Sequence, residues 1–279
     1  MSAAYLRYLL ACGLSRRLPR RAALGLAERL TDRWWARSAR DRAAVASNLS
    51  WMLRTAPDPL MSREVFRHFG RYLVEFFTMD RESAWPVDIE GDEHLQAARR
   101  AGRGVIILSG HLGNWEMGAA AIRRMGVRIG VVALRHADRR VDRLFNRQRA
   151  RCGIEVIPLG AGAAQHSLAR LREGWMIGLV GDREFGTNGM AATLCGHPVT
   201  LPRGPAILSL RSRAPMVPTF LLREAAQRFR LVCEPPIWPD VPHGAVAGAV
   251  ERLMGAYAAV LERYLTRVPT QWLMFQPLT

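Results

Sequence analysis

The sequence predicts an α/β fold, in which a mostly parallel central sheet carries helices on both faces and follows a helical N-terminal region. Apolar residues recur three and four positions apart over residues 2–79, as on amphipathic helices. After residue 102, short apolar runs alternate with helical segments, which is typical of parallel strands buried on both faces. The chain of 279 residues is 49% hydrophobic and 23% charged, so it can build a large core.

The helical region, about residues 1–80, breaks at Pro19 and at the proline turn 56–59. Amphipathic helices are predicted over 42–53 and 62–79. The first helix places four leucines on one stripe and is followed by arginines; these leucines are Leu6, Leu9, Leu10 and Leu14. Two interpretations stay open, because such a helix can lie in the interface of an anionic membrane or pack on its own core. No apolar run reaches the roughly 18–20 residues of a bilayer span.

The catalytic part is predicted to occupy about residues 100–279 within a single domain covering 1–279. Strands are expected over 105–108, 129–134, 154–157, 176–180, 216–222 and 229–232. Helices are expected between most of them, over 116–125, 139–152, 163–173 and 205–211, with a final helix over about 245–265. No internal repeat or linker divides the chain.

Composition excludes several kinds of chemistry. All 40 basic residues are arginine, so sites that need a lysine, such as Walker phosphate loops and Schiff bases, cannot be present. The four cysteines form no C-x-x-C pair and the histidines have no metal-ligand spacing, so we expect no metal, no disulfide framework and a reducing environment. The formal charge of +16 is compatible with nucleic-acid binding, but no recognition motif accompanies it and we expect no nucleic-acid partner.

The segment 104–116 is the most informative, because it brings a histidine to the end of a buried strand. Ligands in open α/β sheets collect at the carboxyl ends of strands. His111 and Glu116 could form a dyad in which the carboxylate holds one ring nitrogen and the other acts as a base. Gly113 lets the backbone approach a substrate, and Asn114 can cap the next helix, whose N–H groups could stabilise an oxyanion. Taken alone, a histidine and a glutamate so spaced are more often a turn residue and a solvated carboxylate.

The fuller pattern resembles a known catalytic motif. H-x-x-x-x-E with Gly113-Asn114-Trp115 inside it resembles the lysophospholipid-acyltransferase superfamily, and in particular the late acyltransferases of lipid A biosynthesis and their relatives that acylate phosphatidylinositol mannosides. Further segments match the family in the expected order: Arg42 with Asn48-Leu49, Gly181-Asp182-Arg183, Leu201 to Ala206, Ala214 to Pro218 and Pro269 to Trp272. Leu194-Cys195-Gly196 and the tail Leu273-Met274-Phe275 depart from the family pattern, which leaves the acceptor open.

The resemblance implies a glycerolipid-acyltransferase-like fold and an acyltransferase without a cofactor. His111 would deprotonate an acceptor hydroxyl that attacks the thioester of an acyl carrier protein or of acyl-CoA, and Glu116 would orient the imidazole. Asp182 and Arg183 would either bind substrate or support the residues that do, the arginine through a phosphate oxygen and Asp182 by holding that guanidinium or a sugar hydroxyl. The alternative is a local ion pair that closes the end of a strand. Arg203 and Arg213 are either further phosphate contacts or solvated surface charges.

The acceptor and the location also follow from this resemblance. A glycolipid hydroxyl of the lipid A type is the preferred acceptor, and a phosphatidylinositol mannoside or a lysophospholipid is the alternative. Residues 1–54 hold eleven arginines against three acidic residues, which would keep the protein on an anionic membrane. We therefore expect a peripheral or monotopic enzyme on the cytoplasmic face of the inner membrane. The same positive charge could attract an acidic acyl carrier protein.

Overall fold

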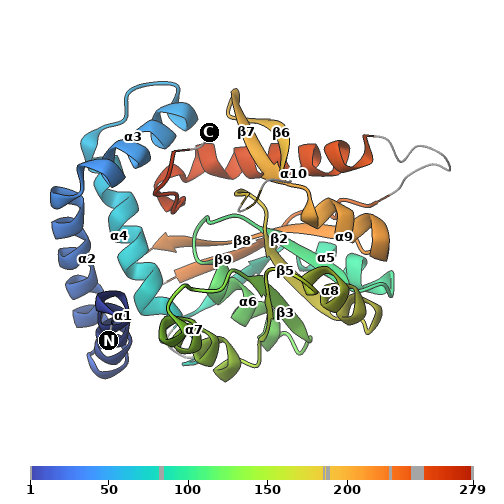
Figure 1. The fold of residues 1–279 in the computed structure, drawn as a ribbon, viewed down its shortest axis with the longest axis horizontal. Coiled ribbons are helices and arrows are strands. Elements are labelled where there is room, and N and C mark those ends of the chain that lie inside the picture. Colours follow the sequence, from blue (N-terminus) through green and yellow to red (C-terminus); the bar gives the residue numbers. More distant parts are fainter. Residues whose placement is uncertain are drawn as a thin grey trace.

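Four helices form the N-terminal region of the computed structural model, which describes residues 2–81, 85–184, 186, 189–225, 228–239 and 248–277. They are α1 (Ala3–Arg17), α2 (Arg20–Arg37), α3 (Ala39–Leu53) and α4 (Pro59–Phe76). The helices lie together at one side of the sheet (Figure 1). The proline turn predicted to separate two helices starts α4, where the Asp58 side chain accepts a hydrogen bond from the Leu60 N–H at 2.8 Å.

Helix α1 has a packed face and an exposed face. Tyr5, Tyr8, Ala11 and Cys12 pack against buried core residues, so the helix docks on the protein as one of the two interpretations expected. Its leucine stripe nevertheless remains exposed, with Leu10 at 63% of its full accessibility. Arg16 fastens the end of the helix through two hydrogen bonds to Asp80, at 2.8 and 2.9 Å. In the described ranges, no helix combines the length and the apolarity that crossing a membrane requires.

The central sheet of the described chain has seven strands in the order β1-β9-β8-β2-β5-β3-β4. The strands are β1 (Val87–Glu90), β2 (Val105–Ser109), β3 (Ile129–Ala133), β4 (Glu155–Pro158), β5 (Met176–Val180), β8 (Met216–Ala225) and β9 (Arg228–Cys233). Strands β8, β2, β5, β3 and β4 are parallel, whereas β9 runs antiparallel to β8 and β1 is parallel to β9. The predicted α/β class with a mostly parallel sheet is confirmed.

Helices cover both faces of the sheet, and alternate side chains of β2 pack with different sets of helices. Val105 and Ile107 pack with α5 (Asp92–Arg100), α6 (Trp115–Arg124) and α7 (Arg139–Arg151). Ile106 and Leu108 point the other way and pack with α8 (Ala163–Arg172), α9 (Gly204–Ser212) and α10 (Ala249–Arg267). The two apolar clusters therefore lie on opposite sides of one sheet. The start of the predicted last helix, residues 245–247, falls outside the described residues.

Two parts of the fold were not predicted. The strand β1 and helix α5 precede the first predicted strand, and β1 pairs at the sheet edge with β9. A separate antiparallel hairpin, β6 (Gly189–Leu194) and β7 (His197–Pro202), packs against α10.

A short 3-10 helix, η2 (Pro269–Gln271), follows α10 and contacts α4. This last segment brings residues near the end of the described chain to the carboxyl end of β2.

Candidate active site

The turn after β2 is held in place by main-chain hydrogen bonds from two distant segments. The Gly113 N–H donates to the Gln271 carbonyl and the Asn114 N–H to the Leu221 carbonyl, both at 2.9 Å. Gly113 has a φ of 65°, and a Cβ atom there would lie 1.9 Å from the Leu221 oxygen, so only glycine fits. The Leu273 N–H donates to the His111 carbonyl at 2.8 Å. His111 is thus fixed on a rigid turn at the end of a core strand.

His111 is paired with Asp182. The imidazole Nδ1 lies 2.8 Å from Asp182 Oδ1, and the His111 main-chain N–H donates to Asp182 Oδ2, also at 2.8 Å. The Asp182 side chain is completely buried, whereas the His111 side chain retains 20% of its accessibility. Asp182 follows β5, which is the parallel neighbour of β2, so the two residues meet at the same edge of the sheet.

Trp272 completes the surroundings of this carboxylate. Its indole Nε1 donates to Asp182 Oδ2 at 2.8 Å, so that this oxygen accepts two N–H groups. Burial opposes ionisation of Asp182, but His111 and the hydrogen bonds from His111 and Trp272 outweigh it, and the pKa of Asp182 lies below its usual value. An ionised Asp182 fixes a proton on Nδ1 and leaves Nε2 as the ring nitrogen that can act as a base.

The predicted partner of His111 was Glu116, and this assignment is corrected. Glu116 is the second residue of α6, where both of its oxygens accept hydrogen bonds from Arg149 of α7, one of them from Nε at 2.9 Å. Burial alone would lower the pKa of Arg149, but the charge and the hydrogen bonds of Glu116 outweigh it and raise that pKa. The Glu116 carboxylate is thus paired with the buried Arg149 guanidinium, and Asp182 is the carboxylate that contacts Nδ1 of His111.

Gly113 and Asn114 were expected to bind substrate, and Asn114 was also expected to cap the next helix. Their N–H groups are already used by the Gln271 and Leu221 carbonyls. The buried Asn114 side chain accepts from the Met117 N–H at 3.1 Å and donates to Glu75 Oε2 at 2.8 Å. These residues shape the turn and join it to α4, and the predicted cap of α6 by Asn114 is confirmed. Their contact with substrate stays a prediction.

The three predicted arginines lie at different places. Arg183 follows Asp182, lines the cavity described below and donates to Gln276. Burial lowers the pKa of Arg183 from its ordinary value. Arg203 precedes α9, lines the same cavity and approaches Glu251 at 3.7 Å. Arg213 follows the other end of α9 and is not among the cavity's lining residues. Asp182 is completely buried behind His111, which fits the expected supporting role and not direct contact with substrate.

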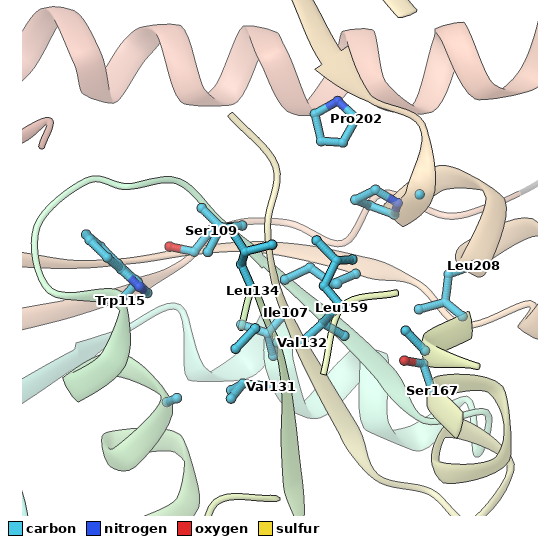
Figure 2. Close-up of a pocket in the computed structure, with 18 of the residues that line it drawn as sticks. Ile107, Ser109, Trp115, Val131, Val132, Leu134, Leu159, Ser167, Pro202 and Leu208 are labelled. Carbon is cyan, nitrogen blue, oxygen red and sulfur yellow. The ribbon is translucent and has the colours of Figure 1, made fainter. Parts of the chain in front are cut away.

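A cavity of about 630 Å³ opens at His111. His111, Trp115 and the Glu116–Arg149 pair line it, together with mostly aliphatic side chains of the sheet, α6, α8 and α9. Figure 2 shows part of this lining, with Trp115 at one end and Ser167 and Leu208 at the other. The space is of the size that proteins use for a small ligand, and its lining suits a hydrocarbon. No group of three or more metal-ligating side chains gathers anywhere in the described part of the chain.

Two site residues were missed at the level of the sequence. Trp272 belongs to a segment that matched the family pattern, yet nothing in that pattern indicated that the indole would contact Asp182. Arg149 carried no signal, because it is one of many arginines in a strongly basic chain. Pairing between α6 and α7 across 33 positions could be found only from the fold.

Comparison with known proteins identifies the family. Residues 4–278 match the family model described as bacterial lipid A biosynthesis acyltransferase. A phosphatidylinositol mannoside acyltransferase of Mycobacterium tuberculosis (strain CDC 1551 / Oshkosh) is 31% identical over 231 residues, which cover 79% of this chain and 70% of that protein. The enzyme with the same name from Mycolicibacterium smegmatis is 28% identical over 228 residues, 79% of this chain and 72% of that protein. The chain therefore belongs to the bacterial lipid A biosynthesis acyltransferase family and is an acyl-transferring enzyme.

Proposed function

We propose that this enzyme transfers a fatty acyl chain from a thioester donor, acyl-CoA or acyl carrier protein, to a hydroxyl of an anionic glycolipid. The observation that carries the proposal is the His111–Asp182 pair at the mouth of an apolar cavity. A base that lies beside a hydrocarbon-lined space suits a reaction between an alcohol and a fatty thioester. The reaction needs no cofactor, because the thioester is already activated.

In this mechanism Nε2 of His111 takes the proton of the acceptor hydroxyl while its oxygen attacks the thioester carbonyl carbon. The carbonyl oxygen becomes an oxyanion, the carbon–sulfur bond then breaks, and the imidazolium returns its proton to the leaving thiolate. Asp182 keeps the other proton on Nδ1 and stabilises the imidazolium that forms. General-base catalysis of this kind contributes about 10²–10⁴-fold.

The remaining polar groups have positioning roles in this proposal. Glu116 and Arg149 join the start of α6 to α7, and both line the cavity, so their pair keeps two walls of the site together. Buried ion pairs are costly to break from one side, since the partner charge is left without compensation. Arg183 and Arg203 line the same space and offer guanidinium groups to a phosphate of either substrate.

Two acceptors are candidates. The family description names lipid A biosynthesis, and this favours a lipid A precursor. The curated relatives are named for phosphatidylinositol mannoside, and this favours an inositol glycolipid. The two share a sugar hydroxyl, fatty chains and negative charge, which fit the cavity and its arginines equally.

The test is acyl transfer in mixed micelles, with purified protein, palmitoyl-CoA or palmitoyl-acyl carrier protein, and each acceptor separately. Product mass identifies the acceptor that gains one acyl chain. His111→Ala should abolish transfer while the protein still folds and unfolds cooperatively on heating. Full activity of a folded His111→Ala protein, or no transfer to either acceptor from either donor, would reject the proposal.

We further propose that the exposed stripe of α1 attaches the enzyme peripherally to anionic membranes. Leucines at the stripe would enter the interface while neighbouring arginines meet the headgroups. The double variant Leu9→Asp/Leu10→Asp should lose flotation with vesicles of phosphatidylglycerol. The control is Leu60→Asp on α4, since Leu60 is equally exposed at 62% but lies outside the stripe. Equal flotation of both variants would show that the exposed stripe of α1 does not attach the enzyme to the membrane.

A further inference from the structure

The cavity extends over both faces of the central sheet. Val131 and Val132 are neighbours on β3, and Gly178 and Leu179 are neighbours on β5, yet all four line the same space. Consecutive residues of a strand point to opposite faces of the sheet. Val131 packs with one of the two apolar clusters and Val132 with the other. The cavity therefore bends around the carboxyl edge of the sheet and has two arms.

The first arm lies against α6 and begins at His111. Ser109 and Ile107 line it along β2, and Gly118, Ala119 and Ile122 line it from the helix. On the function proposed above, the thioester carbon must lie beside His111, so the donor's acyl chain enters this arm. We call it the α6 arm.

The second arm lies between the sheet and helices α8 and α9, on the far side of the carboxyl edge. Ala163, Ser167 and Leu168 line it from α8, and Leu208 lines it from α9. Figure 2 shows Ser167 and Leu208 at the end of the cavity away from Trp115. We call it the α8/α9 arm. The single acyl chain of the donor cannot occupy both arms, since the arms lie on opposite faces of the sheet.

The rim of the α8/α9 arm combines apolar and cationic groups. Leu134 and Leu159 are exposed there at 53% and 43%, and exposed apolar side chains beside polar ones often mark the entrance of a ligand-binding groove. Arg203 and Arg211 line the cavity at the two ends of α9. This combination fits a hydrocarbon chain that is attached to an anionic group. A chain that enters the arm gains about fourfold in affinity for each methylene it buries.

We infer that the α8/α9 arm binds a hydrocarbon chain of the acceptor lipid, whose phosphate lies at Arg203 and Arg211. This inference rests on the proposed function and adds a second lipid site to it. The donor chain and the acceptor chain then lie on opposite faces of the sheet. Their reacting ends meet at its carboxyl edge, where His111 is fixed.

Photolabelling tests the assignment without requiring turnover. One probe is phosphatidylinositol with a diazirine near the end of one acyl chain, and the other is palmitoyl-CoA with a diazirine at the same depth. The first should label peptides of α8 and α9, and the second should label peptides of α6 and β2. Diacylglycerol with the same diazirine should label α8 and α9 at least tenfold less than phosphatidylinositol does, because it lacks the phosphate.

Matched variants sharpen the test. Ser167→Phe fills the α8/α9 arm, and Ala164→Trp narrows its exposed end without touching the core; each should lower phosphatidylinositol labelling at least tenfold. Neither should lower palmitoyl-CoA labelling more than twofold. Ala119→Leu in the α6 arm should do the reverse.

The outcomes separate the two proposals. Palmitoyl-CoA labelling of α8 and α9 would show that the donor chain occupies that arm and would overturn the inference. Phosphatidylinositol labelling that is absent there, or unchanged by Ala164→Trp, would also overturn it. Palmitoyl-CoA labelling of the α6 arm in the same experiment would leave the proposed function standing, whereas its failure at every site would count against that function first.

Discussion

Replacing Asp182 by asparagine tests the catalytic pair with almost no change in shape. Asp182 Oδ2 accepts two N–H groups, from the His111 main chain and from Trp272, while Oδ1 lies 2.8 Å from Nδ1 of His111. The asparagine oxygen must take the place of Oδ2, because an NH₂ group there would face two donors. Its NH₂ group then faces Nδ1, which has to become an acceptor. The ring proton moves to Nε2, and Nε2 can no longer accept the proton of a hydroxyl.

The expected loss is large because the variant fixes the wrong tautomer. In the serine-protease triad the same exchange lowers kcat by about 10⁴-fold. We expect a loss of about 10³–10⁴-fold in kcat for Asp182→Asn, which corresponds to about 4–5.5 kcal/mol of transition-state stabilisation. The KM of the acceptor should change little, since Asp182 is buried behind His111.

The assay is steady-state acyl transfer at neutral pH with the donor and acceptor that the micelle experiment identifies. Asp80→Asn is the control. Asp80, like Asp182, is a hydrogen-bonded carboxylate and accepts two hydrogen bonds from Arg16, but it lies outside the cavity lining. It should keep nearly all of the parent kcat. If Asp182→Asn keeps more than a tenth of the parent kcat, the reasoning about the tautomer is wrong.

Three further predictions address positioning and stability. Trp272→Phe removes one hydrogen bond to a buried carboxylate and should lower kcat roughly 10–100-fold with little change in KM; a rise in KM alone would contradict this role. Gly113→Ala should lower the free energy of unfolding in urea by several kcal/mol, because a Cβ would collide with the Leu221 carbonyl, whereas Gly126→Ala has open space and should cost only about 1–2 kcal/mol; equal losses would refute the collision. Burial, with nearby arginines, lowers the pKa of His68 to about 3. The neutral His68 side chain therefore stabilises the folded state above pH 6.5, and this stabilisation is lost as the pH falls from 6.5 towards 3. His68→Gln should flatten the plot of unfolding free energy against pH in that range, and an unchanged slope would exclude His68 as its cause.

Sequence patterns predicted the central sheet because its strands are buried on both faces. Those strands appear as unbroken apolar runs, and each of the predicted runs from 105–108 to 229–232 contains or overlaps an observed strand. Strand β1 was missed because Val87–Glu90 is short and largely exposed at the sheet edge. The β6–β7 hairpin was missed because its turn uses Cys195, a non-glycine residue with a φ of 52°, next to Gly196.

The site was predicted in its location and corrected in its pairing. A buried strand that ends in a histidine turn was enough to place His111 at the carboxyl edge of the sheet. Its carboxylate partner was assigned to Glu116 by closeness in sequence, whereas the structure uses Asp182, 71 positions away. Two things that local spacing cannot reveal decide this choice. Strand β5 is the neighbour of β2, and Arg149 is the buried cation that takes Glu116.

The position of segment 271–273 in the chain affects when the enzyme becomes active during its synthesis. Through Gln271, Trp272 and Leu273 it contacts the histidine turn and the buried aspartate, and those contacts join the two ends of the α/β core. During synthesis the strands that carry His111 and Asp182 leave the ribosome long before these three residues do. A nascent chain can therefore form its sheet early and still lack an aligned base. Acylating activity would begin only after residue 273 has left the ribosome and folded back onto the histidine turn, so a shorter nascent chain would not yet transfer an acyl group.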